Sequence, residues 1–145
     1  MTAELEKFKW ADLFFVQSPV YWMGLPWLGK KYIDEVFSGG AQTVTYVSDG
    51  RTRSDASKRY GSGGLMDGKR YMLSFTYNCP ISEFDNKEGF FDGLSLDEAN
   101  IALHKTFQFC GVKPHGLFPA PSVIQILQIG PDALFTYRYT DCFQR

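Results

Sequence analysis

The chain has 145 residues, the size of a single domain, and this length is sufficient to bury a hydrophobic core. Its formal net charge is −1, which gives no reason to expect attraction to nucleic acids or to membrane surfaces. No apolar run reaches transmembrane length, and the first residues lack a signal-peptide pattern. Cys79, Cys110 and Cys142 are widely spaced and form neither a disulfide framework nor a metal pair. We therefore expect a cytoplasmic protein with free thiols.

The first part of the chain predicts a helix, a strand and a second helix. Residues 2–10 have the character of a helix, and Ala11–Gln17 is a near-continuous apolar run typical of a strand buried on both faces. Ser18–Leu25 is expected to be a loop. Pro26–Ser38 is expected to be a helix, because proline suits its first turn and two glycines follow its end. Its apolar stripe consists of Leu28, Tyr32, Ile33, Val36 and Phe37.

The second part continues the alternation. Residues 48–64 form a long polar loop, and Lys69–Tyr77 is predicted to be the second strand. A helix is expected over 97–110, opened by Ser95 or Asp97 and closed by Gly111. A weaker strand at 115–120 and a terminal helix at 131–144 complete the prediction. This order predicts a single α/β domain over residues 1–145, with a parallel sheet and helices on both faces.

The loop after the first strand is the most informative segment. It carries Tyr21, Trp22 and Met23 between Pro19 and Gly24. Ligands of open α/β sheets bind beyond the carboxyl ends of the strands, where such a loop offers aromatic faces and backbone N–H groups to a flat molecule. The alternative is a hydrophobic patch that a partner subunit covers.

A second loop follows the second strand in the same way. It contains Thr76, Tyr77, Asn78 and Cys79, whose hydroxyl, amide and backbone N–H groups suit the polar edge of an isoalloxazine ring. The alternative is a turn stabilised by Asn78. Because the two loops follow parallel strands, they are expected to line one crevice.

The polar loop carries a basic cluster of Arg51, Arg53, Lys58 and Arg59. These side chains either meet the phosphates of a dinucleotide or lie in solvent. Tyr60 follows the cluster and is a candidate lid over a bound ring. The glycines at 63 and 68 do not form a phosphate-binding P-loop, because they precede a strand and Arg70 stands where serine or threonine is needed.

No hydrolytic apparatus is recognisable. His104 lies in the third predicted helix and His115 precedes the third predicted strand, and neither has a partner at metal-ligand spacing, so no metal site is expected. No nucleophile–base set is identified either. This pattern suits an enzyme whose cofactor supplies the chemistry, so the catalytic residues stay unassigned apart from Tyr60 as a lid.

Several longer segments resemble one family. They are Trp22-Met-Gly-Leu-Pro-Trp, Lys30-Lys-Tyr-Ile-Asp, Ser48-Asp-Gly-Arg-Thr-Arg, Lys58-Arg-Tyr-Gly-Ser-Gly-Gly-Leu and Lys69-Arg-Tyr-Met-Leu-Ser. They resemble the flavodoxin-like NAD(P)H:quinone reductases, in the branch called modulator of drug activity B. The resemblance implies a flavodoxin-like three-layer fold, a homodimer, bound FAD, two-electron reduction of quinones by NADPH and a role in oxidative stress. The FAD contacts that it implies are Pro19, Val20, Tyr21, Trp22, Tyr60, Thr76, Tyr77, Asn78 and Cys79.

Relative to that family, the chain is expected to lack the first strand, the phosphate loop, the first helix and the second strand. Cys79 stands where the family usually has alanine. Two hypotheses follow. In the first, the chain is a quinone reductase that keeps the isoalloxazine half of the site and binds FAD weakly. In the second, it is a short form without catalysis that associates with a partner.

Overall fold

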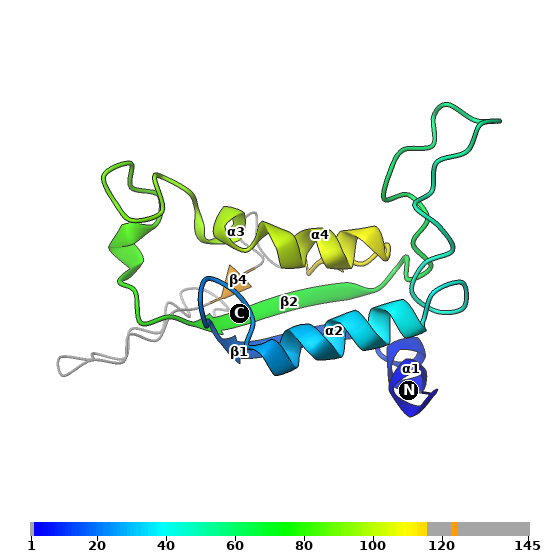
Figure 1. The fold of residues 1–145 in the computed structure, drawn as a ribbon, viewed down its shortest axis with the longest axis horizontal. Coiled ribbons are helices and arrows are strands. Elements are labelled where there is room, and N and C mark those ends of the chain that lie inside the picture. The colour runs from blue at the N-terminus through cyan, green and yellow to red at the C-terminus, as the bar shows by residue number, and fades with distance from the viewer. Residues whose placement is uncertain (1, 116–122, 125–145) are drawn as a thin grey trace, which may run out of the picture.

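The computed structural model describes residues 2–115 and 123–124 and shows an alternation of helices and strands (Figure 1). In chain order the elements are α1 (Thr2–Trp10), β1 (Leu13–Pro19), α2 (Trp27–Gly39), β2 (Arg70–Thr76), the 3-10 turn η1 (Ile81–Glu83), α3 (Leu96–Ala99), α4 (Ile101–Phe109), β3 (Lys113–Pro114) and β4 (Val123–Ile124). No helix among these residues is long and apolar enough to cross a membrane.

All strand pairings in the described sheet are parallel, as the sequence predicts. β1 pairs with β2 along its whole length, from Leu13 opposite Arg70 to Pro19 opposite Thr76. β3 and β4 also pair with β2, which is therefore the central strand of the described sheet. The predicted strand at 115–120 begins beyond β3, so His115 follows a strand instead of preceding one. Residues 116–120 and the predicted helix at 131–144 lie outside the described residues.

A cluster of aromatic rings attaches the helices to one face of the sheet. Phe107 of α4 stacks on Tyr71 of β2, with ring centroids 4.6 Å apart, and meets Phe37 of α2 edge to face at 5.7 Å. Phe8 of α1 lies 4.9 Å from Phe14 of β1 and 5.3 Å from Phe37. Aromatic pairs at these separations are favourable beyond the area that they bury. The cluster therefore packs α1, α2 and α4 on the face that carries Phe14 and Tyr71.

The opposite face of β1 is exposed, so the expectation that this strand is buried on both faces is wrong for the described part of the chain. Burial alternates along β1, and Leu13 and Phe15 are 43% and 56% exposed. The reason is that successive side chains of a strand point to opposite faces and the aromatic cluster covers only one. The apolar stripe of α2 divides similarly: Val36 and Phe37 are buried, but Leu28 is exposed.

The single helix predicted over 97–110 is two helices in the structure. α3 is preceded by its N-cap Ser95, whose side chain forms a capping box with that of Glu98, as the choice of Ser95 as a cap predicts. The chain then leaves helical geometry at Asn100, with φ −108° and ψ 19°, and α4 follows. Gly111, at φ +89°, ends the helical segment.

Candidate functional site

The two loops that the sequence singles out begin side by side. The backbone N–H of Val20 donates to the carbonyl of Thr76 over 2.9 Å, directly after the last pair of the β1–β2 ladder. Parallel pairing therefore brings the segments Pro19–Leu25 and Thr76–Pro80 to the same edge of the sheet, at the carboxyl ends of its two longest described strands. This is the position at which open α/β sheets bind ligands.

The aromatic loop folds into a tight two-residue turn. Tyr21 and Gly24 exchange backbone hydrogen bonds of 2.8 and 3.1 Å. The two residues between them, Trp22 and Met23, have φ values of +49° and +63°. Such a turn requires positive φ at both central positions, where asparagine and glycine are preferred. A residue with a Cβ in this region costs about 1–2 kcal/mol, so the turn is strained.

The strained turn displays its side chains to solvent. Trp22 is 98% exposed, and its neighbours Tyr21 and Met23 are 61% and 55% exposed. Backbone strain and exposed aromatic surface are both unfavourable for the folded chain alone, and strained non-glycine residues concentrate at functional sites. The turn is therefore suited to present an indole ring to a ligand or a partner.

The second loop is anchored by Tyr77, whose side chain points into the protein. Tyr77 is buried, its hydroxyl accepts a 2.7 Å hydrogen bond from Asn100 Nδ2, and its ring meets Phe84 edge to face at 5.4 Å. Burial raises the pKa of the Tyr77 phenol, and the hydrogen bond from Asn100 opposes that shift. The phenol is thus unavailable for stacking on a ligand, and Tyr77 can contribute only through its backbone.

Asn78 and Cys79 leave backbone donors open at this edge. Asn78 is exposed, and Cys79 is half-buried, with the pKa of its thiol raised by burial and by the nearby Glu83 carboxylate. Within the part of the chain that the structure describes, the backbone N–H groups of these two residues donate no hydrogen bond. Open N–H groups beside an exposed indole suit a planar ligand whose edge carries carbonyl and nitrogen acceptors.

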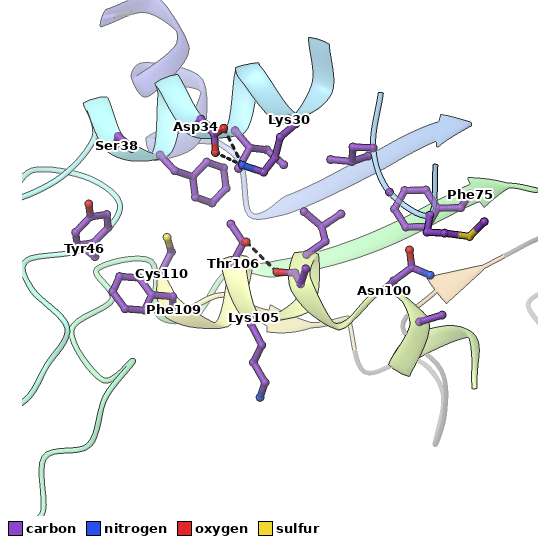
Figure 2. Close-up of a pocket in the computed structure, with 18 of the residues that line it drawn as sticks. Lys30, Asp34, Ser38, Tyr46, Phe75, Asn100, Lys105, Thr106, Phe109 and Cys110 are labelled. Atoms are coloured by element: carbon purple, nitrogen blue, oxygen red, sulfur yellow. Dashed lines mark hydrogen bonds and ion pairs between the residues drawn. The ribbon is translucent and has the colours of Figure 1, made fainter. Parts of the chain in front are cut away.

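A groove of about 650 Å³ extends from this edge between α2 and α4 (Figure 2). Met23 and Phe75 line one end, Ile33 and Leu103 line the middle, and Tyr60 lines the other end. The ion pair between Lys30 and Asp34 of α2 also borders the groove. The lining is mainly apolar, which suits a hydrophobic ligand or the helices of a second protein.

Tyr60 does not lie with the other candidate residues. Its ring packs 5.5 Å from that of Phe109, at the end of α4, and the Arg51 guanidinium, which is paired with Asp49, lies 5.5 Å from its centroid. A nine-residue helix is about 14 Å long, so Tyr60, beside the last residue of α4, lies roughly one helix length from the Tyr77 end of α4. Figure 1 shows the 48–64 loop and the tip of β2 at opposite ends of the molecule.

The sequence contained a signal for this placement. The 48–64 loop connects a helix to the next parallel strand, and such loops lie at the amino end of the sheet, opposite the ligand edge. The sequence reasoning also missed Asn100, which contacts Tyr77 and borders the groove. The sequence carried one indication of its role: asparagine is a poor helix former, and Asn100 stands in the interior of the helix predicted over 97–110.

We expect the double substitution Trp22→Asn with Met23→Gly to raise the free energy of unfolding by about 1 kcal/mol, because this pair adopts positive φ without strain. Urea unfolding followed by circular dichroism measures the change. The matched control is Met23→Ala, which shortens the side chain but keeps the Cβ, and it should change stability by less than about 0.5 kcal/mol. A turn pair that destabilises the chain would contradict the strain inferred here.

Two proteins of known sequence are about 40% identical to this chain. The chain is 42% identical over 122 residues to an uncharacterised protein of Schizosaccharomyces pombe and 41% identical over 127 residues to the NADPH:quinone oxidoreductase MdaB of Haemophilus influenzae. The two alignments cover 84% and 88% of this chain, but 62% and 66% of the relatives. The chain thus spans less than two thirds of the length of these curated relatives.

The fold is also found among solved structures. General stress protein 14 of Treponema denticola, in complex with FMN, matches with a TM-score of 0.54 at 22% identity, over 77% of this chain and 56% of that one. At this identity the match supports the fold alone. A family model described as a flavodoxin-like fold matches residues 1–127. The chain belongs to the family with the flavodoxin-like fold.

Proposed function

We propose that the chain forms the ring-binding part of the flavin site of an FAD-dependent NAD(P)H:quinone oxidoreductase. The observation that carries the proposal is the strained, exposed Trp22-Met23 turn beside the open backbone of Asn78 and Cys79. The 41% identity to an NADPH:quinone oxidoreductase supports NADPH and a quinone as the two substrates. A bound flavin supplies the transfer of two electrons as a hydride.

The residues of the chain hold and orient the ring. Tyr21 and Trp22 offer their aromatic faces, while Pro19 and Val20 form the floor of the crevice at the end of β1. On the other side, the segment Thr76–Cys79 offers its backbone donors to the polar edge of the ring. None of these groups needs to be ionised, so their contribution is positioning and stacking.

The distant position of Tyr60 supports a homodimeric site, in which Tyr60 reaches the crevice of a second copy. α2 and α4 both run from the carboxyl end of the sheet to its amino end. A two-fold axis perpendicular to these helices reverses their direction in the second copy, and so brings the Tyr60 end of one copy to the Trp22 end of the other. The apolar groove between α2 and α4 would lie in that interface. In this arrangement Tyr60 is a lid supplied in trans.

A second function is favoured by exposed apolar residues beyond the turn. Trp27 and Leu28, at the start of α2, are 75% and 62% exposed and extend the surface formed by Tyr21, Trp22 and Met23. A surface of this kind also serves a protein that associates with a partner and binds no flavin. Titration with FAD distinguishes the two functions.

We expect Trp22→Ala to weaken FAD binding by about tenfold or more, since stacking of an aromatic side chain on a base is worth about 1–3 kcal/mol. Quenching of flavin fluorescence measures the affinity. Trp10→Ala is the matched control, because Trp10 is also largely exposed, at 84%, but precedes β1 at the other end of the sheet. Equal affinities for the wild type and Trp22→Ala would refute the assignment of the aromatic turn.

Steady-state kinetics should show a ping-pong mechanism. The two loops bound a single crevice, so the nicotinamide of NADPH and the quinone must occupy it in turn. Initial rates measured over a grid of NADPH and quinone concentrations should give parallel double-reciprocal plots. Intersecting plots would mean that both substrates bind together and would exclude a shared crevice.

Mixing two inactive variants tests whether Tyr60 acts in trans. In a mixed dimer of Trp22→Ala with Tyr60→Ala, one site carries both substitutions and the other carries neither. Random exchange of subunits should therefore restore about a quarter of the wild-type sites, as expected for a symmetric dimer. Each variant alone is the control. Activity that stays at the level of the single variants would place Tyr60 in the site of its own chain or outside any site.

A further inference from the structure

We propose that Asn100 is a positioning residue, which holds the turn at Tyr77–Cys79 in the conformation that leaves its backbone donors open to the crevice. The inference rests on the proposed function only for the identity of the ligand, which is the flavin ring. The conformation of the turn is a property of the chain alone and can be measured without a ligand.

The side-chain amide of Asn100 links two elements of the fold. Its Nδ2 group donates to the hydroxyl of Tyr77 over 2.7 Å and to the carbonyl of Leu96 over 2.8 Å. Asn100 and Tyr77 are 7% and 5% exposed, so both bonds are sheltered from water. An amide nitrogen has two hydrogens, and both are used here. The hydroxyl at the end of the Tyr77 side chain is therefore fixed to the junction between α3 and α4.

Asn100 stands at the junction of two helices, as the C-cap residue of α3 and the N-cap residue of α4. Asn100 is the N-cap residue of α4, and asparagine at this position normally bonds to a backbone N–H of the first turn. The Asn100 side chain makes no such bond. It instead interrupts what the sequence predicts as one continuous helix and bonds to the residue that follows β2. Its bond to Leu96 satisfies a carbonyl of α3, whereas its bond to Tyr77 serves neither helix end and links the junction to the candidate site.

The link reaches the crevice through the Tyr77 side chain. Tyr77 is held at its ring by Phe84 and at its hydroxyl by Asn100. The preceding residue, Thr76, is held by the hydrogen bond from Val20. With both residues fixed, the backbone of Asn78 and Cys79 must leave β2 in one direction. Figure 2 shows Asn100 at the Phe75 end of the groove, close to the end of β2.

The same strand provides a matched control. Tyr71 lies on the same face of β2 as Tyr77, is also buried, and its hydroxyl is 2.6 Å from Nδ1 of His104 in α4. Tyr71→Phe, within β2, and Tyr77→Phe, directly after it, therefore remove the same atom and disturb a buried bond to the helical layer. Only Tyr77→Phe breaks the link to the crevice.

The experiment is ¹⁵N relaxation on the full chain without ligand, in the wild type, Asn100→Ala, Tyr77→Phe and Tyr71→Phe. We expect backbone order parameters of about 0.85 at Tyr77–Cys79 in the wild type and in Tyr71→Phe, and values below about 0.6 in the other two variants. FAD affinity should fall by about tenfold in Asn100→Ala and in Tyr77→Phe. It should fall no further in the double variant, because both substitutions break the same hydrogen bond between Asn100 and Tyr77.

The outcomes separate this inference from the proposed function. If Asn100→Ala and Tyr77→Phe lose order at Tyr77–Cys79, the positioning role is supported. If the wild-type chain at the same time binds no FAD, the flavin site is refuted and the positioning role still stands. Unchanged order parameters in these variants, in a chain that binds FAD, overturn the positioning role alone. Equal loss of order in Tyr71→Phe also overturns it, because the effect would then follow from any weakened contact between β2 and the helices.

Discussion

The parallel ladder between β1 and β2 is the constraint on which the candidate site depends. Its register ends with Pro19 opposite Thr76, and the next backbone bond, from Val20 to Thr76, extends the pairing into the loops. A one-residue shift would turn every side chain of β1 to the opposite face and would expose Phe14 in place of Phe15. The meeting of the two loops and the burial of the aromatic cluster are therefore set by one register.

The aromatic cluster fixes the helices relative to that ladder. Phe107 contacts residues of β1, β2 and α2, so α4 cannot move along the sheet without breaking packing on three elements. Close-packed interiors resist such displacement. The groove between α2 and α4 thus has a rigid floor, while the residues at its two ends, Met23 and Tyr60, lie in loops. This division is typical of sites in which a packed scaffold positions functional loops.

Local patterns in the sequence predicted the helices and strands well, but they predicted the burial of these elements and their long-range contacts less well. The apolar run of β1, the capping residue Ser95 and the glycines after α2 are local signals, and the structure confirms the elements that they indicated. The exposed face of β1 could not be predicted, because an apolar run does not state which of its faces a neighbour covers. The break at Asn100 depends on a partner 23 residues away in sequence, Tyr77, which no local pattern reports. Tyr60 was grouped with the two loops because the order of helix and strand around it, which places it at the amino end of the sheet, was not used.

Two unfavourable features of the fold lie together in the turn after β1, although Gln42, Asp85 and Asp92 also adopt positive φ elsewhere in the described residues. Trp22 and Met23 adopt backbone conformations that favour glycine, and the indole of Trp22 is almost fully exposed. Each feature alone lowers the stability of the folded chain, and each lies beside the carboxyl end of β1 or β2. Elsewhere in the described residues, buried groups such as Tyr71 and Thr45 make hydrogen bonds within the fold. Binding at the crevice would offset these costs, since a ligand that contacts only the folded chain stabilises it. The strained and exposed turn at Trp22 and Met23 therefore lies at the same edge that the topology indicates for ligand binding.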